Sequence, residues 1–518
     1  MNTPEEHREK LRSVWQSTQE PPALSPLTAD ISTDVCVVGA GIAGLSVAYE
    51  LAKAGRSVVV LDDDRIGSGM TGRTTAHLVN ALDDRYFEIE RMLGADMARL
   101  AVESHTAAIA RVAAIVAAEE SDCDFEMLDG FLFNPPGESQ EVLDREFEAA
   151  QRAGIAIERV ERAPIPDFDT GPALRFLNQA QFHPTKYLAS LAAAIERAKG
   201  RVFTGTHATH ITGGETARIE TKSGATVTAG SVVVATNTPI NDRYLIHTKQ
   251  GPYTTYVIAL RVPGGSIARA LFWDTAQEAG MQDQHGPIPY HYVRTQKVGE
   301  HMVLIVGGED HKTGQNEDYE APFRSLESWT RARFPMAGEL EYRWSGQVME
   351  PIDGMGFIGR NPMDEKNVYV VSGDSGNGMT HGVIAGMLIS DLILGRENPW
   401  TALYDPGRVS LKATPDFLHE NLNVAAQFRD YVTGGDLAGE HQIAPGCGAV
   451  LRKGASKVAA FRDDAGALHE FSAVCPHLKC IVHWNGAERT WDCPCHGSRF
   501  DALGTVLTGP ANTNLAPA

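Results

Sequence analysis

The pattern that most restricts the fold of this chain lies in residues 34–62. A short apolar segment, residues 34–38, runs directly into Gly39-Ala40-Gly41-Ile42-Ala43-Gly44, and a helix-forming segment and a second apolar segment follow, ending at Asp62. In a dinucleotide-binding unit, such glycines let a pyrophosphate approach the helix N-terminus, and the acid accepts a hydrogen bond from a ribose hydroxyl. The order of strand, turn, helix, strand and acid favours a βαβ nucleotide site over a simple tight turn.

A second pattern, near the end of the chain, consists of two Cys/His pairs. Cys475 and His477 form a C-x-H pair, and Cys493 and His496 form a C-x-x-H pair. Zinc modules usually combine a C-x₂-C pair with an H-x₃₋₅-H pair, whereas each pair here joins one cysteine to one histidine. A 2Fe-2S cluster with two thiolates on one iron and two imidazoles on the other needs this donor set. We expect an electron-transfer centre, with a structural zinc site as the alternative.

Residues 436–518 resemble Rieske proteins of the respiratory type. This resemblance implies the metal ligands Cys475, His477, Cys493 and His496 and a disulfide between Cys480 and Cys495. Ser498 lies where the family's serine donates to a bridging sulfide, and Pro510 belongs to a segment similar to the loop that covers the cluster. Phe500 stands where the family has a tyrosine, so one donor is missing, and we predict a reduction potential below that of respiratory Rieske proteins.

Upstream, several short segments occur in a characteristic order, namely residues 67–76, 182–184, 232–237, 344–359 and 368–380. Together they resemble flavoenzymes of the D-amino acid oxidase type, including glycine and sarcosine oxidase-like members. The resemblance implies bound FAD and a late helix whose N-terminus faces the flavin's pyrimidine edge. The cofactor contacts that it implies are Gly39, Gly41, Ile42, Ala43, Gly44, Asp62, Asp63, Gly72, Arg73, Thr74, Ala208, Ala235, Thr236, Gly376, Asn377, Gly378, Met379 and Thr380.

The predicted fold class is α/β plus all-β. It comprises a Rossmann-like FAD-binding domain of the glutathione reductase type with an antiparallel-sheet substrate domain, and a C-terminal Rieske β-sandwich. We assign residues 1–410 to the oxidoreductase, 411–435 to a helical linker and 436–518 to the Rieske domain. The expected nucleotide-binding parts are about 31–100, 175–247 and 345–405, and the substrate-binding parts about 101–174 and 248–344.

Composition excludes some partners and favours a location. The net charge is −20 with no Lys/Arg-rich block, so nucleic acid is not an expected partner. The first ten residues are charged and lack an apolar core, so no signal peptide is expected. No run approaches the roughly 18 apolar residues of a membrane span. Cys36 and Cys123 are isolated from the other five cysteines, and we expect a cytoplasmic protein with one shielded disulfide.

Several departures from the amine-oxidising flavoenzymes shape the expected chemistry. Residues 124–446 contain no cysteine, and Arg73 stands where some relatives have a flavin-linked histidine, so we expect non-covalent FAD. Val348 and Gly376 occupy positions where glycine oxidase-like members have arginines that bind a carboxylate, so a small free amino acid is not the expected substrate. Ile305 occupies the position of an oxygen-activating lysine, which favours a dehydrogenase over an oxidase.

Residues 253–261, 290–294 and 301–308 predict antiparallel strands of the substrate domain. The candidate catalytic residues on or near these strands are Tyr256, His291 and Arg294, with His311 and Arg73 as further polar candidates. The alternative for each is a strand-end or surface polar residue that never contacts substrate. Hydride transfer from an amine carbon needs orientation and a neutral amine more than a strong base, so the lack of a His/Asp pair does not exclude it.

These features predict an FAD-dependent dehydrogenase that oxidises a C–N bond of an amine or N-substituted amino acid. Its electrons would pass through the cluster to an external one-electron acceptor, either a small redox protein or a quinone. One alternative is an oxygen-using amine or amino-acid oxidase with a structural or sensing Rieske domain. Another is a reductase that serves a partner protein, which would ordinarily require a second βαβ fingerprint for a pyridine nucleotide, and the sequence shows only one G-x-G-x-x-G.

Overall fold

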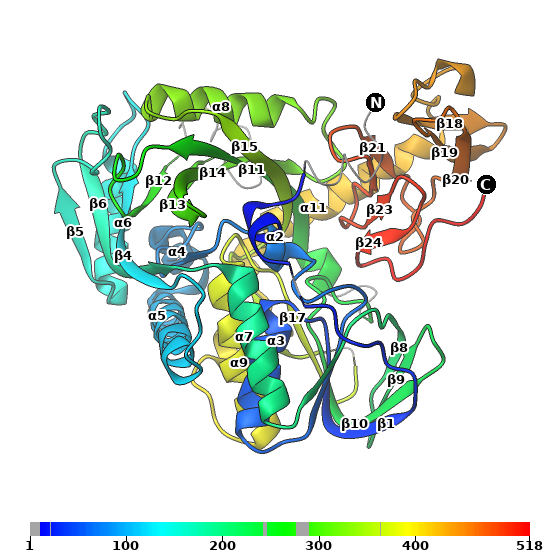
Figure 1. The fold of residues 1–518 in the computed structure, drawn as a ribbon, viewed down its shortest axis with the longest axis horizontal. Coiled ribbons are helices and arrows are strands. Elements are labelled where there is room, and N and C mark those ends of the chain that lie inside the picture. The colour runs from blue at the N-terminus through cyan, green and yellow to red at the C-terminus, as the bar shows by residue number, and fades with distance from the viewer. Residues whose placement is uncertain (1–10, 21, 242–245, 276–289, 363) are drawn as a thin grey trace.

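The computed structural model describes residues 11–20, 22–241, 246–275, 290–362 and 364–518. Two large sheets with their helices form one body, and two small sheets near the C-terminus form a second body beside it (Figure 1). The first ten residues, on which the expectation about a signal peptide rests, lie outside the described residues.

The first large sheet has eight strands in the order β16-β17-β10-β1-β2-β7, with the β8–β9 hairpin joined to β10. Its centre is β1 (Ile31–Val38), which pairs in parallel with β2 (Val58–Leu61) and with β10 (Thr226–Val234). The parallel nucleotide-binding fold predicted from the glycine motif is therefore confirmed. The remaining strands of this sheet are β7 (Arg201–Phe203), β8 (Ala208–Thr212), β9 (Ala217–Thr221), β16 (Phe357–Arg360) and β17 (Val368–Ser372).

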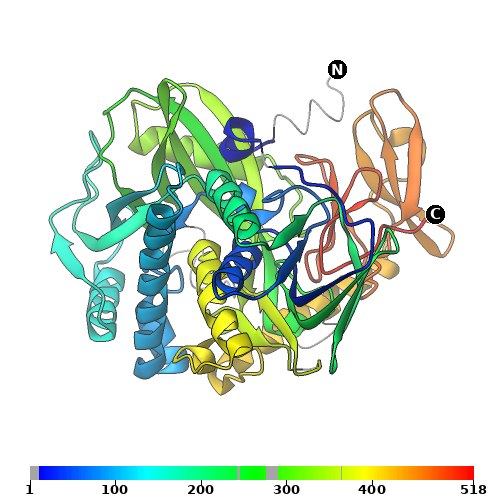
Figure 2. The ribbon, with the colours of Figure 1, turned by 60° about the horizontal axis from the view of Figure 1, so that its bottom comes forward.

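Side-chain alternation along β1 gives this sheet two buried faces. Val35 and Val37 belong to the core that includes the helices, whereas Cys36 and Val38 pack toward the β8–β9 hairpin. On the helical face, α3 packs against both α7 and α9, and α3 and α9 lie side by side in Figure 2. These helices are α3 (Ile42–Lys53), α7 (Pro184–Arg197) and α9 (Gly378–Leu394).

The second large sheet has nine strands in the order β15-β11-β14-β13-β12-β4-β6-β3, with β5 joined to β6. The antiparallel strands predicted for the substrate domain are confirmed as β11, β13 and β14. Helix α8 (Ala321–Arg333) packs against β11 and β14. The strand bounds are β3 (His77–Leu78), β4 (Glu126–Phe133), β5 (Ile157–Val160), β6 (Ala173–Gln181), β11 (Gln250–Val262), β12 (Leu271–Asp274), β13 (Tyr292–Val298), β14 (His301–Lys312) and β15 (Leu340–Pro351).

The structure moves two predicted segment boundaries. The expected boundaries near 175 and 345 fall inside β6 and β15, which both belong to the second sheet. The chain leaves that sheet only where these strands end, at Gln181 and Pro351. Backbone pairing with β4 and β11 fixes the two boundaries, and a local sequence pattern does not contain that information.

Helix α5 (Ala95–Ala118) is, within the described part of the chain, the one helix long and apolar enough to cross a membrane. Its length and composition are weak evidence of a span, because the core helix of a folded domain passes the same test. Here α5 packs against α4, α6 and α9. The other helices of this body are α2 (Val14–Thr18), α4 (Tyr86–Leu93), α6 (Glu141–Ala153) and α10 (Thr401–Tyr404).

The C-terminal body begins after a helical connector made of α11 (Thr414–Gln427) and the 3-10 helix η5 (Phe428–Tyr431). Its two sheets are antiparallel, as expected, and Trp491 and Phe500 lie fully buried in its core. The strands are β18 (Gly448–Lys453), β19 (Ser456–Arg462), β20 (Leu468–Ser472), β21 (His483–Asn485), β22 (Thr490–Asp492), β23 (Arg499–Asp501) and β24 (Val506–Thr508). We call residues 436–518 the C-terminal domain.

Candidate active site and metal centre

A cavity of about 1560 Å³ is lined by both large sheets and by the C-terminal domain. Most ligand pockets measure about 300–1,000 Å³, so this cavity has room for a dinucleotide and a substrate together. The predicted cofactor contacts that line it are Gly39, Gly41, Ile42, Ala43, Asp62, Asp63, Arg73, Thr74, Ala208, Ala235, Thr236, Gly376, Asn377, Gly378 and Met379. The predicted contacts outside the lining are Gly44, Gly72 and Thr380.

Close backbone packing explains the glycines at the nucleotide end. A Cβ on Gly39, which has a φ of +108°, would lie 2.4 Å from the Ala235 carbonyl oxygen. A Cβ on Gly44 would lie 1.9 Å from the Gly39 carbonyl oxygen, so Gly44 shapes the turn without lining the cavity. The N-cap residue of α3 is Gly41, which has no side chain to cap the helix and lines the cavity. An uncapped helix N-terminus in a glycine cradle fits a pyrophosphate.

Asp62 directly follows β2 and lines the cavity, as the motif predicts. Its Oδ2 accepts a hydrogen bond from the Ala40 backbone N–H at 2.6 Å, and its Oδ1 accepts from Asp64 N–H at 3.0 Å. Burial raises the pKa of Asp62 to about 7, against the lowering effect of these bonds. Asp63 is 56% exposed at its side chain and lies 3.5 Å from His207 Nδ1.

The loop after β2 is held by the N-terminal segment, which the sequence analysis did not connect to the site. Thr71 Oγ1 in this loop accepts from the Ile42 backbone N–H at 3.0 Å. Trp15 of α2 donates from Nε1 to the Thr74 carbonyl oxygen at 2.6 Å, and Gln16 lines the cavity. The capping box of Ser13 and Gln16 marks a helix start in the sequence, but the place where α2 docks carries no local signal.

The opposite end of the cavity is acidic, a feature that the sequence analysis missed. The carboxylates that line it include Asp83, Asp84, Asp310, Glu350, Asp353 and Asp374, and Arg85 lines it as well. Burial raises the pKa of Asp83 and Asp374 to about 6 and of Asp84 and Asp310 to about 7, and it raises the pKa of Glu350 well above its usual range. The Tyr290 hydroxyl donates to Asp83, and Ser375 donates to Asp84 and, at 2.9 Å, to Glu350. Val348 and Gly376, the positions without a carboxylate-binding arginine, also line the cavity.

The three predicted catalytic residues do not line this cavity. Tyr256 points into the core beneath α8, where its hydroxyl lies 2.9 Å from His311 Nε2, while Thr255 and Val257 on the other face of β11 line the cavity. Strand β11 was predicted from the sequence, but its hydrophobic pattern did not show which of its two faces borders the cavity.

His291 and Arg294 are held by the protein itself. His291 stacks on Trp329 and lies between Asp274 at 2.9 Å and Glu309 at 3.2 Å; burial lowers its pKa, but the two carboxylates raise it to about 8. Arg294 is fully buried and donates to backbone carbonyls, including that of Ala76 at 2.9 Å, and burial lowers its pKa to about 9. These contacts fit structural roles.

The predicted cluster ligands meet in the C-terminal domain. The thiols of Cys475 and Cys493 are buried hydrogen-bond partners, and the rings of His477 and His496 lie 5.1 Å apart between centroids. In the described part of the chain, the buried Nδ1 of His496 has no hydrogen-bond partner, as expected for a metal-ligand atom. Two thiols and two imidazoles in this arrangement fit a 2Fe-2S cluster.

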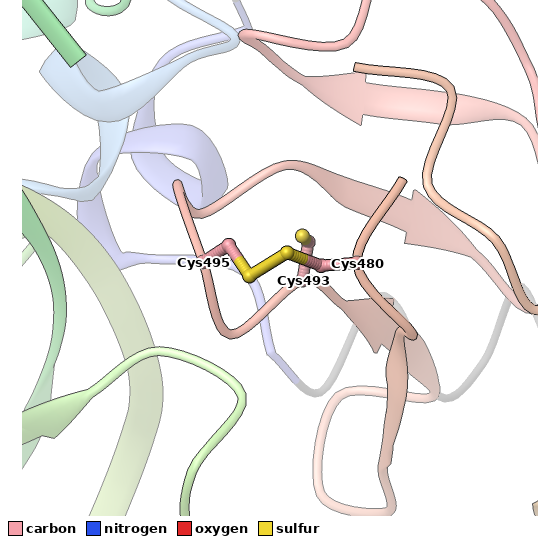
Figure 3. Close-up of side chains that lie close together, drawn as sticks. All are labelled: Cys480, Cys493 and Cys495. Carbon is pink, nitrogen blue, oxygen red and sulfur yellow. A yellow bond between two sulfur atoms is a disulfide. The ribbon is translucent and has the colours of Figure 1, made fainter. Parts of the chain in front are cut away.

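Cys480 and Cys495 form a disulfide that joins the two ligand loops (Figure 3). The Cys493 sulfur lies within 4.8 Å of both disulfide sulfurs, but bonded sulfurs carry no thiolate to donate to a metal. Cys493 therefore pairs as a ligand with Cys475, and the disulfide braces the loops.

The predicted surroundings of the cluster are also present. Ser498 is hydrogen-bonded to Cys475 and accepts from the Ala511 backbone N–H at 2.9 Å. Pro510 is buried and follows Gly509 through a cis peptide bond. Phe500 is fully buried, and its ring offers no hydrogen-bond donor.

The loop that carries Cys493 and His496 is buried against the rest of the chain, whereas His477 in the other ligand loop is partly exposed and Lys479 is exposed. His247, in the 3-10 helix η2 (Ile246–Lys249), lies 4.9 Å from the His477 ring and 6.0 Å from the His496 ring between centroids. Gln347 Nε2 donates to the Gly497 carbonyl oxygen at 2.8 Å. Neither His247 nor Gln347 carries a local sequence signal, because their roles depend on how the two bodies dock.

A second contact lies at the nucleotide end of the cavity. Asn512 Nδ2 donates to the Ala208 carbonyl oxygen at 2.9 Å, and the Asn512 carbonyl oxygen lies 3.2 Å from His207 Nε2. Asn512 and Ala208 both line the cavity, so the C-terminal domain forms part of the nucleotide site.

Comparison with known families identifies both parts. Residues 34–392 match the family model described as FAD dependent oxidoreductase, and residues 436–517 match the Rieske 2Fe-2S domain. The chain is 31% identical over 509 residues to the "Putative Rieske 2Fe-2S iron-sulfur protein YhfW" of Bacillus subtilis, with 97% of each protein covered. It is 29% identical over 380 residues to the Gamma-glutamylputrescine oxidoreductase of Escherichia coli, covering 71% of this chain and 85% of that protein.

Solved structures share the fold of the first body. Glycine oxidase from Geobacillus kaustophilus superposes with a TM-score of 0.60 at 18% identity, covering 73% of this chain and 99% of the oxidase. At this identity the likeness concerns the fold alone.

Proposed function

Because the chain belongs to the FAD dependent oxidoreductase family and ends in a Rieske 2Fe-2S domain, we propose that it is a dehydrogenase acting on a C–N bond. The proposed substrate is an amine or an N-substituted amino acid, and the proposed electron route runs through the cluster to an external one-electron acceptor. The observation that carries the proposal is the seating of the cluster loops against the FAD-binding body, where His247 contacts both imidazole ligands. When bound, FAD takes two electrons from a carbon donor and the cluster carries one at a time.

The residues proposed to hold FAD gather at two helix N-termini. The glycine turn before α3 and the acid Asp62 would receive the pyrophosphate and a ribose, as their packing and lining positions support. Asn377 and Gly378 begin α9 on the same cavity and would place a second helix N-terminus against the flavin ring. We propose that FAD binds without a covalent link, since the described residues that line the cavity include no cysteine.

The acidic end of the cavity supports an amine as substrate. Carboxylates attract an ammonium group and disfavour a free carboxylate, and no arginine stands at Val348 or Gly376 to reverse that preference. The Escherichia coli relative is named for a substrate that is itself an amine derivative, in agreement with this class. In the proposed site, Asp83 and Glu350 orient the cationic end of the substrate, and Tyr290 holds Asp83 in place.

Electron transfer to an external acceptor is proposed over direct reaction with oxygen. Ile305 is fully buried in β14 and supplies no cation that could stabilise a reduced oxygen species. A small redox protein or a quinone is the proposed acceptor.

The test is a screen of amines and N-methylated amino acids against the full-length protein without oxygen. Each compound is scored for loss of flavin absorbance, and hits are examined by low-temperature EPR for the reduced cluster. The proposal expects flavin reduction followed by cluster reduction. Stoichiometric peroxide that is unchanged in the Cys475→Ser variant would instead identify an oxidase, and rapid bleaching by NADH would identify a reductase.

A further inference from the structure

The His496 side of the cluster site is covered by the protein's own first body, while His477 is partly exposed. His247 is 3% exposed and His496 is 5% exposed, although strands β11 to β15 of the second sheet lie between them in the sequence. The plane of the His247 ring makes angles of 75° with His477 and 62° with His496. One edge of each ring therefore meets the face of another, the arrangement that aromatic rings favour.

The seat around these rings is closely fitted. A Cβ on Gly497 would lie 2.5 Å from Pro252 Cβ, so the ligand loop approaches β11 with no space for a side chain. A Cβ on Gly314 would lie 2.9 Å from the Asp492 carbonyl oxygen. Gly314 belongs to the first body, so this body also approaches the backbone of the C-terminal domain with no space for a side chain. Packing this tight leaves no room for water between the surfaces at these points.

Two amide side chains fix the position of the ligand loop. Gln347 of β15 donates to the Gly497 carbonyl oxygen at 2.8 Å, and Gln315 donates to the Pro494 carbonyl oxygen at 3.1 Å. Both acceptors lie in the loop that carries Cys493 and His496. The seat therefore combines ring contacts at the imidazoles with hydrogen bonds to the ligand-loop backbone.

We propose that His247 is a positioning residue for the Rieske cluster. It holds the rings of His477 and His496 in one orientation and shields the His496 side of the cluster from solvent and from small reductants. Contacts outside the ligand set fix the orientation of metal-bound imidazoles and tune the metal, which is the physical basis of this role. The inference rests on the cluster assignment in the proposed function, but not on the substrate or on the direction of electron flow.

The test uses the full-length, cluster-loaded protein and two readouts that need no substrate. These are the g-values of the reduced cluster in EPR and the rate at which ascorbate reduces the oxidised cluster. We expect His247→Ala to shift the g-values and to accelerate reduction several-fold, because the His496 side becomes accessible. His247→Phe, which keeps an aromatic ring, should reduce as slowly as the parent. His210→Ala, at an exposed histidine on β8, is the matched control and should leave both readouts unchanged.

Gln347→Ala keeps the test decisive if His247→Ala does not fold, as judged by gel filtration and circular dichroism. Loss of the bond to Gly497 should loosen the same seat and accelerate ascorbate reduction. If His247→Ala folds and keeps the g-values and the reduction rate of the parent, the proposal is overturned. If only Gln347→Ala folds, the same result in that variant overturns it. A Phe variant that is reduced as fast as the Ala variant would also do so. If no amine reduces the flavin, the proposed function fails while both cluster readouts still decide this inference.

Discussion

Arg73 and Glu488 form an ion pair across the boundary between the FAD-binding body and the Rieske domain, with Nη1 3.3 Å from Oε1. The Glu488 side chain is 5% exposed and also pairs with Arg499. Burial alone would raise the pKa of Glu488, but Arg499 and Arg73 hold it down at about 2. The pair was not predicted, because Arg73 was expected to contact the cofactor or the substrate.

Replacement of Arg73 should weaken the docking of the two bodies. Arg73→Ala is expected to lower the free energy of unfolding by about 1–3 kcal/mol, since a buried carboxylate loses one charged partner. The folded pKa of Glu488 is depressed, so its stabilising effect is present above the unfolded pKa of about 4.3 and is lost as the pH falls toward 2. Denaturant unfolding at neutral pH checks the prediction. Arg99→Ala is the control, because Arg99 forms an exposed pair with Asp96. Equal free energies of unfolding in the two variants would contradict the prediction.

Asp62→Ala should reduce FAD affinity. Loss of one hydrogen bond to a charged group corresponds to roughly a tenfold or greater weakening. Flavin fluorescence during titration of the apoprotein with FAD measures the effect. Glu215→Ala, at an exposed residue in the loop between β8 and β9, is the control. Parental affinity in Asp62→Ala would show that the acid does not contact the nucleotide.

Loss of the disulfide should destabilise the cluster site. In Cys495→Ser the two ligand loops are no longer joined, and removal of a native disulfide from a small domain typically costs about 2–5 kcal/mol. The variant should lose its visible cluster absorbance at a lower temperature than the parent. Cys447→Ser, which changes an exposed free cysteine in the same domain, should behave as the parent does. Equal melting of both variants would contradict the bracing role.

Asp83→Asn should make the folded protein more stable while weakening substrate binding. Burial raises the pKa of Asp83 to about 6, although the Tyr290 hydroxyl and Arg85 oppose the shift. A raised folded pKa means that stability declines as the pH rises from about 4, the unfolded value, to about 6. Above pH 6 the variant should therefore have a higher melting temperature than the parent. The decline in melting temperature between pH 4 and pH 6 that comes from Asp83 should be absent in the variant.

The same variant should bind a cationic amine more weakly. We expect KM to rise about tenfold, the effect of losing one charge-assisted contact. Asp96→Asn is the control, because the Asp96 side chain is 84% exposed on α5. An unchanged KM combined with increased stability would remove Asp83 from the substrate site.

Phe500→Tyr should raise the reduction potential of the cluster. Phe500 is fully buried in the core of the Rieske domain, and a hydroxyl there would supply the donor that the family's tyrosine provides. Hydrogen bonds to the cluster sulfurs favour the reduced, more negative state. A redox titration followed by EPR measures the change. Phe461→Tyr controls for a hydroxyl added elsewhere in the same core, and equal potentials in both variants would refute the prediction.

The features that were predicted correctly from the sequence are built by residues that lie close together in the sequence. The glycine turn before α3, the acid at the end of β2 and the two Cys/His pairs are local patterns, because a turn, a helix N-terminus or a metal loop is built by residues a few positions apart. The disulfide partner Cys480 lies in the same loop as Cys475, so the family resemblance was enough to pair it with Cys495.

The residues predicted to be catalytic do not line the cavity, because the sequence does not show which side of a strand borders it. Tyr256 and Arg294 lie on the predicted strands and His291 directly precedes β13, but their side chains contact the core, backbone carbonyls or neighbouring carboxylates. A strand presents alternate residues to opposite faces, and only the neighbouring layers decide which face borders the site.

By itself, the sequence determined the two cofactor types, the fold of each body and the residues that form each local turn. The tertiary structure alone decided that the acidic residues Asp83 and Glu350 share one cavity and that His247 contacts the cluster's imidazoles. The reason is physical: contacts between segments far apart in the chain depend on how whole sheets and domains pack, and no local pattern records that packing.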